Sequence, residues 1–428
     1  MIRTCLSVIC VAVLMTCLLP GCNDSKGTNS PEPRLGTAVP QNPGSGNAAG
    51  ATFDKTALDA TSDGGTITFQ NIGAPGWFPS RRDPAVGPCN AESSGTCCMT
   101  KYVITSDSLT PWDEDLIMTL RGPMIVKQIT AYQPDSANVT QWNRVSMWDN
   151  ASPTVMSGIA FKGNNTETAG FQGIVGNTCL VNVSTNRKFA TGTGSMPYCP
   201  PTSDTQYWGW IGSKMIIIQA YMPRLSTGAI PAAQNCGNDT TNNWYDAPWI
   251  GLSHGEMVRS GAFGSCQCYA KDPTQWWLAD GCGQFNVFEV VNDNNTSQNF
   301  DVFSTNFFGY AGYVGEGPCG QACKVSGLDP KVDLVNKSTS LEAATGATAS
   351  PTKGPGAAFR RPETGYRFFV ILLDVKTRQV QLALIHPANV PATVAPLLPG
   401  LPAQVSRATI DNVLALKLPA PNSAVINW

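Results

Sequence analysis

One short stretch of the sequence, GCGQFNVFEVVND (Gly281–Asp293), carries three polar residues at a spacing that could do chemistry. Gln284 and Asn286 precede the single acid, Glu289, in an otherwise apolar run that is typical of a buried β-strand. Side chains alternate faces along a strand, so Glu289 would point away from the two amides unless one β-bulge lies before it. With that bulge the three polar groups form one line. A retaining glycosidase needs such a line, because its nucleophile and acid/base carboxyl groups lie roughly 5–5.5 Å apart.

The same stretch resembles a family signature. The run from CQC to GCGQFNVFEVV is similar to the strand GCGEFDIFEVL of the glycosyl-hydrolase-like family of yeast "target of SBF" cell-wall proteins. Its E-x-D-x-x-E core is also that of family 16 glycoside hydrolases, which are β-jelly rolls that act mainly on β-1,3-glucans. TITFQNIGAPGWF, LIMTLRGPMIVKQITAYQP, WNRVSMWD, KMIIIQAYMP and APWIGLSHGEMVR extend the similarity over residues 66–387.

The resemblance implies a role for each polar position of the strand. Glu289 stands at the acid/base position, Gln284 at the nucleophile position and Asn286 at the position of the middle Asp. An amide cannot form a glycosyl-enzyme ester, and it removes a charge that would stabilise the transition state. We therefore expect hydrolysis to be weak or lost. Taken without the resemblance, a lone Glu in a buried strand is often only a hydrogen-bonded core residue.

Aromatic residues near this strand could bind a sugar chain. The Trp of the family's P-A-I-W-L-L strand is replaced by Gly251, and we expect Trp249 on the opposite face. Trp276 and Trp277 lie in an apparent insertion before the signature and are candidate stacking platforms. The alternative for each Trp is ordinary core packing.

Other catalytic arrangements fit the sequence less well than this one. Asp280 or Glu256 could replace the lost nucleophile in an inverting scheme, which needs carboxyl groups roughly 6.5–9.5 Å apart. Ser253 and His254 are adjacent, but no G-x-S-x-G elbow accompanies them, which argues against a serine hydrolase. With two histidines and no paired C-x-x-C spacing, we expect neither a metal site nor a cofactor.

The elements that would position these residues are short strands. Strand patterns occur at residues 65–73, in two runs over 115–134 that Gly122-Pro123 separates, and at 213–223. The last of these is β-branched and suits a strand covered on both faces. Residues 365–387 predict a hairpin with its turn at 376–378, and residues 408–418 have a helical pattern.

The predicted fold is all-β, a jelly-roll β-sandwich like family 16 glycoside hydrolases with a smaller N-terminal β region. The expected division is a signal peptide over 1–22, a flexible linker over 23–62, the N-terminal β region over 63–150, the jelly roll over 151–387 and a Pro-rich tail over 388–428.

The N-terminus predicts export. MIRTCLSVICVAVLMTCLLPGC has one Arg and then an apolar stretch of signal-peptide length. LPGC resembles a bacterial lipobox, which implies lipidation at Cys22 and, with Asn23 next, favours the outer membrane. The alternative is an ordinary cleaved signal and a secreted or cell-wall protein. The eleven cysteines after Cys22 are expected to form disulfides, and their odd number leaves one over.

These observations favour an exported protein whose partners are a β-glucan-type polysaccharide and, through the lipid, a membrane. A net charge of −2 argues against nucleic acid as a partner. Two rival functions stay open: an active β-1,3-glucanase or transglycosylase that uses another carboxylate, and a non-catalytic structural or interaction lipoprotein.

Overall fold

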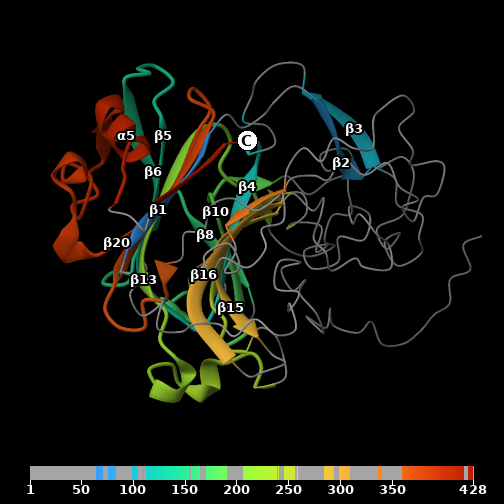
Figure 1. The fold of residues 1–428 in the computed structure, drawn as a ribbon, viewed down its shortest axis with the longest axis vertical. Coiled ribbons are helices and arrows are strands. Elements are labelled where there is room, and N and C mark those ends of the chain that lie inside the picture. Colours follow the sequence, from blue (N-terminus) through green and yellow to red (C-terminus); the bar gives the residue numbers. More distant parts are fainter. Residues whose placement is uncertain are drawn as a thin grey trace, which may run out of the picture. The chain divides into compact units, whose positions relative to one another are not determined.

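The computed structural model of this chain describes residues 64–70, 76–82, 99–104, 109, 112–153, 156–163, 170–189, 206–238, 240, 245–255, 258, 284–293, 298–308, 336–339, 359–418 and 423–427. These residues fall in one compact unit, Ala38–Trp428. Most of them lie in two large sheets (Figure 1).

The first sheet has ten strands in the described part of the chain and runs β21-β6-β5-β13-β19-β20-β1-β22. β7 pairs with β6, and β9 pairs with β5. Except for the parallel pair β1–β22, neighbouring strands are antiparallel. The bounds are β21 Gln404–Ser406, β6 Gln141–Asp149, β5 Met124–Pro134, β13 Lys214–Tyr221, β19 Arg367–Asp374, β20 Gln379–Ile385, β1 Gly65–Gln70, β22 Ser423–Asn427, β7 Met156–Ser157 and β9 Ile174–Val175.

The second sheet has eight described strands in the order β17-β16-β15-β14-β4-β10-β8, with β18 paired to β16. All of its pairs are antiparallel. The bounds are β17 Asn336–Thr339, β16 Gln298–Phe308, β15 Gln284–Asp293, β14 Trp249–His254, β4 Leu116–Arg121, β10 Leu180–Ser184, β8 Ala160–Gly163 and β18 Phe359–Arg360.

The inner faces of the two sheets share one apolar core. Phe69 of β1 meets Phe285 of β15 at 6.0 Å between ring centroids, and Phe369 of β19 meets Phe288 of β15 at 5.1 Å. All four rings are fully buried. The predicted all-β sandwich is therefore confirmed.

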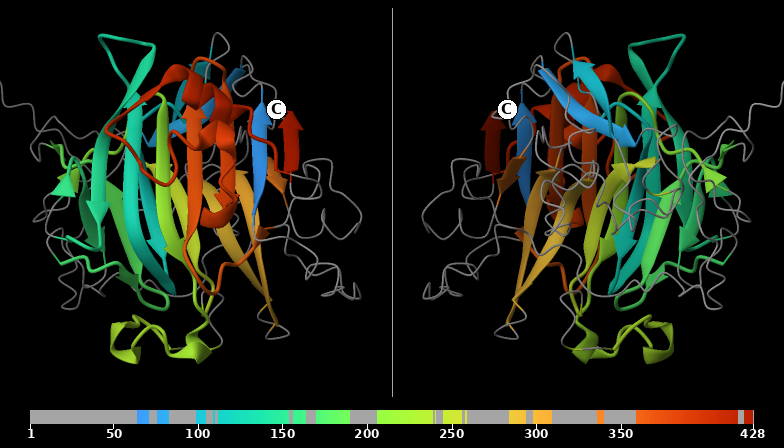
Figure 2. Two further views of the ribbon diagram at one scale, coloured as in Figure 1. Left: turned by 90° about the vertical axis from the view of Figure 1, so that its left-hand side faces the viewer. Right: turned by 90° about the vertical axis from the view of Figure 1, so that its right-hand side faces the viewer.

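The outer face of the ten-stranded sheet is covered by residues 387–418, which we call the C-terminal segment. This segment holds two 3₁₀ turns, η7 Pro387–Asn389 and η8 Ala392–Val394, and the helix α5 Arg407–Leu414. Figures 1 and 2 show it packed on β5, β6, β13 and β20. A second apolar cluster joins its side chains to outward-facing residues of β13, β19 and β20. The strands contribute Met215, Ile217, Phe368, Val370, Leu372, Ala383 and Ile385, and the C-terminal segment contributes Val394, Leu397, Leu398, Leu401, Ile410 and Val413.

This cover explains the composition of β13. Ile216 and Ile218 enter the core between the sheets, whereas Met215 and Ile217 pack against the C-terminal segment. The prediction that this strand is covered on both faces is confirmed. The predicted hairpin and helical pattern are also confirmed, as β19–β20 and α5.

The two β regions expected on either side of residue 150 share both sheets. β1, β5 and β6 lie in the ten-stranded sheet beside β13 and β20, and β4 lies in the eight-stranded sheet between β14 and β10. Strands that are adjacent along the chain are thus separated in space, because β4 and β5 enter different sheets on either side of Gly122-Pro123.

Smaller elements complete the described structure. β2 Gly76–Arg82 pairs with β3 Met99–Ile104, and β11 Lys188–Phe189 pairs with β12 Gln206–Tyr207. Two 3₁₀ turns, η2 Leu225–Thr227 and η3 Ala232–Gln234, precede β14. Among the helices described, we find none with the length and apolar character needed to cross a membrane.

Candidate functional site: the outer face of the eight-stranded sheet

The signature strand β15 contains the bulge that its polar residues require. Its register shifts between Asn286 and Glu289 against β16, and at the same place against β14. Phe285 and Phe288 are three residues apart, yet both side chains enter the core. One extra residue therefore lies between them, and Glu289 follows on the outer face. The predicted bulge is confirmed, but the side chains of Gln284 and Asn286 lie outside the described structure.

Glu289 stands in a row with two other side chains across the sheet. In the backbone register Trp249 of β14 is opposite both Glu289 of β15 and Arg121 of β4. Arg121 Nη2 lies 3.4 Å from Glu289 Oε1. Its Cζ lies 5.5 Å from the Trp249 ring centroid, within the range of a cation–π contact. These three residues, which we call the Arg–Trp–Glu row, come from three neighbouring strands.

The row is mostly shielded from solvent. The exposed fraction is 2% for the Arg121 side chain and 3% for Trp249, whereas the Glu289 side chain is 14% exposed. The next row on the same face is polar too: Thr119 Oγ1 donates to Asn182 Oδ1 at 2.7 Å. Of the Arg–Trp–Glu row, Glu289 is the group that a ligand could reach most easily.

Arg121 keeps its charge in this setting. Burial lowers the pKa of the Arg121 guanidinium, while the charge of Glu289 and its hydrogen bond with that residue raise it. Because an ordinary arginine titrates above 12, the side chain stays a cation at neutral pH. A cation at such a distance favours the ionised form of a carboxylate. The arrangement therefore suits a Glu that accepts hydrogen bonds better than one that donates a proton.

The expectation that Trp249 lies on the face opposite to position 251 is wrong. Residues two apart in a regular strand share a face. A Cβ built on Gly251 would collide with Cζ2, Cε2 and Cη2 of Trp249. The indole of Trp249 thus fills the space above residue 251, and the two positions share one face of β14.

Two buried arginines fix the entry to β14. Arg121 Nε donates to the carbonyl oxygen of Ala247 at 2.8 Å. Arg361, which is 2% exposed, donates to the carbonyl oxygen of Asp246 at 3.0 Å and to its carboxylate at 2.8 Å. Asp246 has a positive φ of 53°, a conformation that an L-residue needs such support to hold. The two consecutive carbonyl groups place Trp249 at the start of its strand.

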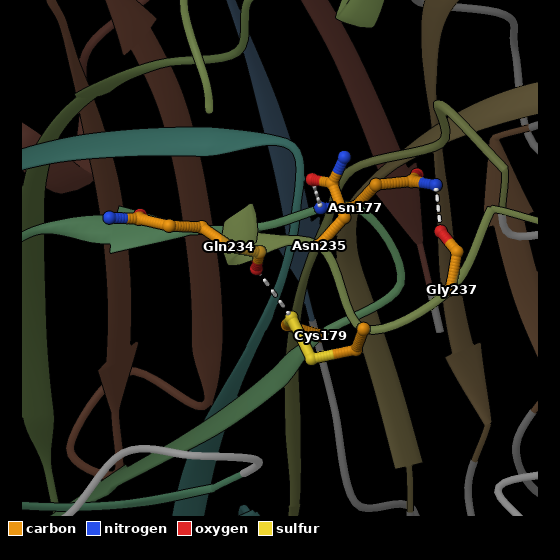
Figure 3. The surroundings of a disulfide bond; sticks show 6 residues. Asn177, Cys179, Gln234, Asn235 and Gly237 are labelled. Atoms are coloured by element: carbon orange, nitrogen blue, oxygen red, sulfur yellow. Dashed lines mark hydrogen bonds between the residues drawn. A yellow bond between two sulfur atoms is a disulfide. The ribbon is translucent and has the colours of Figure 1, made fainter. Parts of the chain in front are cut away.

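A disulfide ties down the loop that leads to this entry. Cys179, just before β10, is bonded to Cys236 (Figure 3). The fully buried Asn177 donates from Nδ2 to the carbonyl oxygen of Gly237 at 2.7 Å, and its Oδ1 accepts from the backbone of Asp246 at 2.9 Å. One of the expected disulfides is thus present, and it supports the loop behind the Arg–Trp–Glu row.

Several predicted site residues cannot be placed. Trp276, Trp277 and Cys22 lie outside the described residues, as do the alternative acids Asp280 and Glu256. Within the described ranges no group of three or more His, Cys, Asp or Glu side chains could hold a metal ion.

Arg121 is the site residue that the sequence reasoning missed. It ends the apolar run LIMTLR just before Gly122-Pro123. A charged residue at the end of a buried strand needs a partner, because arginine is rarely fully buried unless it is paired. That signal could have marked Arg121, although it could not have named Glu289.

The fold and the site define a class of protein, and comparison with known families agrees with it. The chain is an all-β sandwich, and the strand that resembles a glycoside-hydrolase signature lies in its eight-stranded sheet. Residues 65–134 match the family model "Cell wall protein YJL171C/Tos1, N-terminal". The predicted resemblance to this yeast cell-wall family is thereby confirmed.

The chain is also similar to a particular yeast protein. The chain is 22% identical over 256 residues to the Saccharomyces cerevisiae protein "Probable circularly permuted 1,3-beta-glucanase YJL171C". The alignment covers 50% of this chain and 58% of that protein, so the chain matches little more than half the length of its relative. No solved structure matches the chain.

Proposed function

We propose that this protein is an exported, glycoside-hydrolase-like protein that binds a β-1,3-glucan-type chain on the outer face of its eight-stranded sheet, with weak or absent hydrolysis. The observation that carries the proposal is the ion pair of Arg121 with Glu289, 3.4 Å long, on the signature strand. A strand that carries an amide at the nucleophile position and a cation beside its remaining acid is better suited to holding a sugar than to cutting it.

The glucan is favoured by the relative rather than by the geometry alone. That yeast protein is named as a 1,3-β-glucanase, and the matching family model describes a cell-wall protein. The geometry adds an aromatic ring beside an acceptor and a donor, which is the set of groups that sugar rings and hydroxyls require. Gln284, Asn286 and Glu289 would line the binding face, and Trp276 or Trp277 would supply a further platform.

The same comparison supports a proposal about the location of the protein. The cell-wall description of the family favours a secreted or cell-wall-associated protein over an outer-membrane lipoprotein. Lipidation of Cys22 remains our proposal from LPGC alone. Labelling cells with a fatty-acid analogue would test it, since a Cys22→Ala variant should lose any label that the native chain carries.

The experiment that tests the function compares the chain from residue 63 onward with its Gln284→Glu/Asn286→Asp variant. Both are incubated with a panel of β-glucans, and the released oligosaccharides are identified by mass spectrometry. We expect the native chain to bind without cutting and the variant to cut. Adding Glu289→Gln to the variant should abolish the cutting, because the unit then lacks its acid.

Other outcomes separate the rival functions. If the native chain cuts efficiently, another carboxylate acts as the nucleophile and the proposal fails. If no polysaccharide shifts the unfolding temperature of either protein, the interaction-protein alternative holds, since a ligand that binds only the folded state must stabilise it.

A further inference from the structure

Glu289 forms an ion pair with a residue from a strand that is not its neighbour in the sheet. β4 and β15 are separated by β14, and neighbouring strands lie about 4.8 Å apart. The guanidinium of Arg121 must therefore cross Trp249 to reach the carboxylate. Along this path it contacts the carbonyl oxygen of Ala247 at 2.8 Å, the ring of Trp249 at 5.5 Å and the Glu289 carboxylate at 3.4 Å.

We infer that Arg121 is a positioning residue that keeps the Glu289 carboxylate ionised and fixed beside Trp249, so that Glu289 accepts hydrogen bonds from sugar hydroxyls instead of donating a proton. This inference rests on the proposed function and names the chemistry of the contact. The ligand class is a neutral polyhydroxylated chain whose hydroxyl groups act as donors.

The surroundings of Glu289 support the ionised form. Among the described neighbours, β4 contributes the cation Arg121, β14 contributes Trp249, and Ser304 is the cross-strand partner on β16. In a retaining glycosidase a second carboxylate close by favours the protonated form of the acid. Position 284 is an amide in this chain and supplies no such charge.

The ionised form fits one of the two available roles. A carboxylate that has lost its proton only accepts hydrogen bonds, and it can take several donors. A general acid must instead carry a proton at the start of the reaction. Acids restored at positions 284 and 286 would favour the protonated form of Glu289, whereas Arg121 favours the ionised form. Arg121 is therefore a second residue that determines whether the site binds a glucan or cuts it.

The first experiment measures the charge without any ligand. Carbon-13 NMR of labelled glutamate side chains is recorded at about pH 4.3, where an unperturbed Glu is half protonated. The Glu289 signal is assigned by its loss in Glu289→Gln. We expect this signal at the ionised position in the native chain and in Arg121→Lys, and a shift towards the protonated position in Arg121→Gln. A protonated Glu289 in the native chain, or no shift in Arg121→Gln, would overturn the inference.

The second experiment measures binding of a soluble linear β-1,3-glucan. We expect Arg121→Gln and Glu289→Gln each to raise the dissociation constant at least tenfold. The double variant should be no weaker than the weaker single variant, since residues that act as one unit are not additive. Arg121→Lys should retain most of the affinity. Independent, additive effects of the two substitutions would contradict the inference.

A matched control is available in the same chain. Arg407 and Asp374 form another shielded ion pair, with side chains 14% and 1% exposed, on the C-terminal side of the ten-stranded sheet. Arg407→Gln should lower the unfolding temperature and leave the dissociation constant unchanged. If Arg121→Gln fails to fold, Arg121→Lys and Glu289→Gln carry the test. Absence of binding by the native chain overturns the proposed function and the hydroxyl contact, whereas the NMR result alone decides the charge.

Discussion

The two sheets differ most on their outer faces. On the ten-stranded sheet, Ile217, Phe368 and Val370 point outward and are sealed by the C-terminal segment. On the eight-stranded sheet the corresponding face carries Thr119 and the Arg–Trp–Glu row. Both inner faces are apolar and share one core. The outer faces therefore differ in chemistry: one is apolar and covered, whereas the other is polar and leaves the Glu289 side chain 14% exposed.

The two shielded ion pairs show the same contrast. Arg407 binds both oxygens of Asp374 at 2.8 Å and thereby joins the first residue of α5 to the end of β19. Burial by itself would raise the pKa of Asp374, but hydrogen bonds from Arg407 and Thr377 lower it overall. Arg121 meets one oxygen of Glu289 at 3.4 Å. The short bidentate pair suits a structural role. The contact of Arg121 with Glu289 is longer and involves one carboxylate oxygen, so it constrains the Glu289 carboxylate less.

Removing the C-terminal segment should have the largest effect, because it uncovers the outer face of the ten-stranded sheet. A chain that ends at His386 exposes the outward apolar residues of β13, β19 and β20 together, and it also loses β21 and β22. We expect it to aggregate, because an apolar patch of this size promotes association. Soluble yield and circular dichroism measure the outcome. Deletion of residues 1–37, which lie outside the described residues, is the control and should leave the fold intact.

A smaller change tests the same cover. Ile410 of α5 is fully buried in the second apolar cluster. Ile410→Ala should lower the free energy of unfolding by about 2–5 kcal/mol, measured by denaturant titration, and leave glucan binding unchanged. Val139 is 76% exposed, so Val139→Ala should change stability by less than about 0.5 kcal/mol. Equal effects of the two substitutions would show that the cover contributes little.

Local patterns predicted the strands better than their arrangement. The hairpin β19–β20 has strong apolar runs on both sides of a short turn, and β13 contains three consecutive isoleucines. Neither pattern reveals that β4 and β5 enter different sheets, because pairing with β14 and β13 is decided by contacts far along the chain. The C-terminal segment has a helical pattern, but its packing depends on the sheet face that it covers.

Local features of the site could be predicted from the sequence, but its contacts between distant strands could not. The spacing from Asn286 to Glu289 required a bulge, and the backbone has one. The face of Trp249 was misjudged, since the ring lies over Gly251 on the outer side of β14. Arg121 was missed because its partner Glu289 is 168 residues away, and no local pattern connects them.

Gly251 offers a sharper test of the outer face. In Gly251→Ala the new Cβ collides with the Trp249 ring, so the ring must move. We expect a loss of about 1–3 kcal/mol in the free energy of unfolding, as for other overpacked sites, and weaker glucan binding. Gly400 has no heavy atom near the position of its Cβ, and Gly400→Ala is the control. If Gly251→Ala bound glucan as tightly as the native chain, Trp249 would not contribute to the binding face.

The last expected effect depends on pH and concerns a residue that connects the two sheets. The fully buried Lys214 begins β13, and its Nζ donates to the carbonyl oxygens of Trp112 and Glu114, in the turn before β4, at 2.9 Å each. Burial lowers the pKa of Lys214 to about 7, against the opposing effect of three nearby acids. Between about pH 7 and pH 10.4 the unfolded chain then binds more protons than the folded chain, so stability should rise with pH by at most about 1.4 kcal/mol per unit. Denaturant titrations of the native chain and of Lys214→Met across this range measure the difference in slope. Identical slopes would mean that Lys214 keeps its proton in the folded state and joins the sheets as an ammonium group.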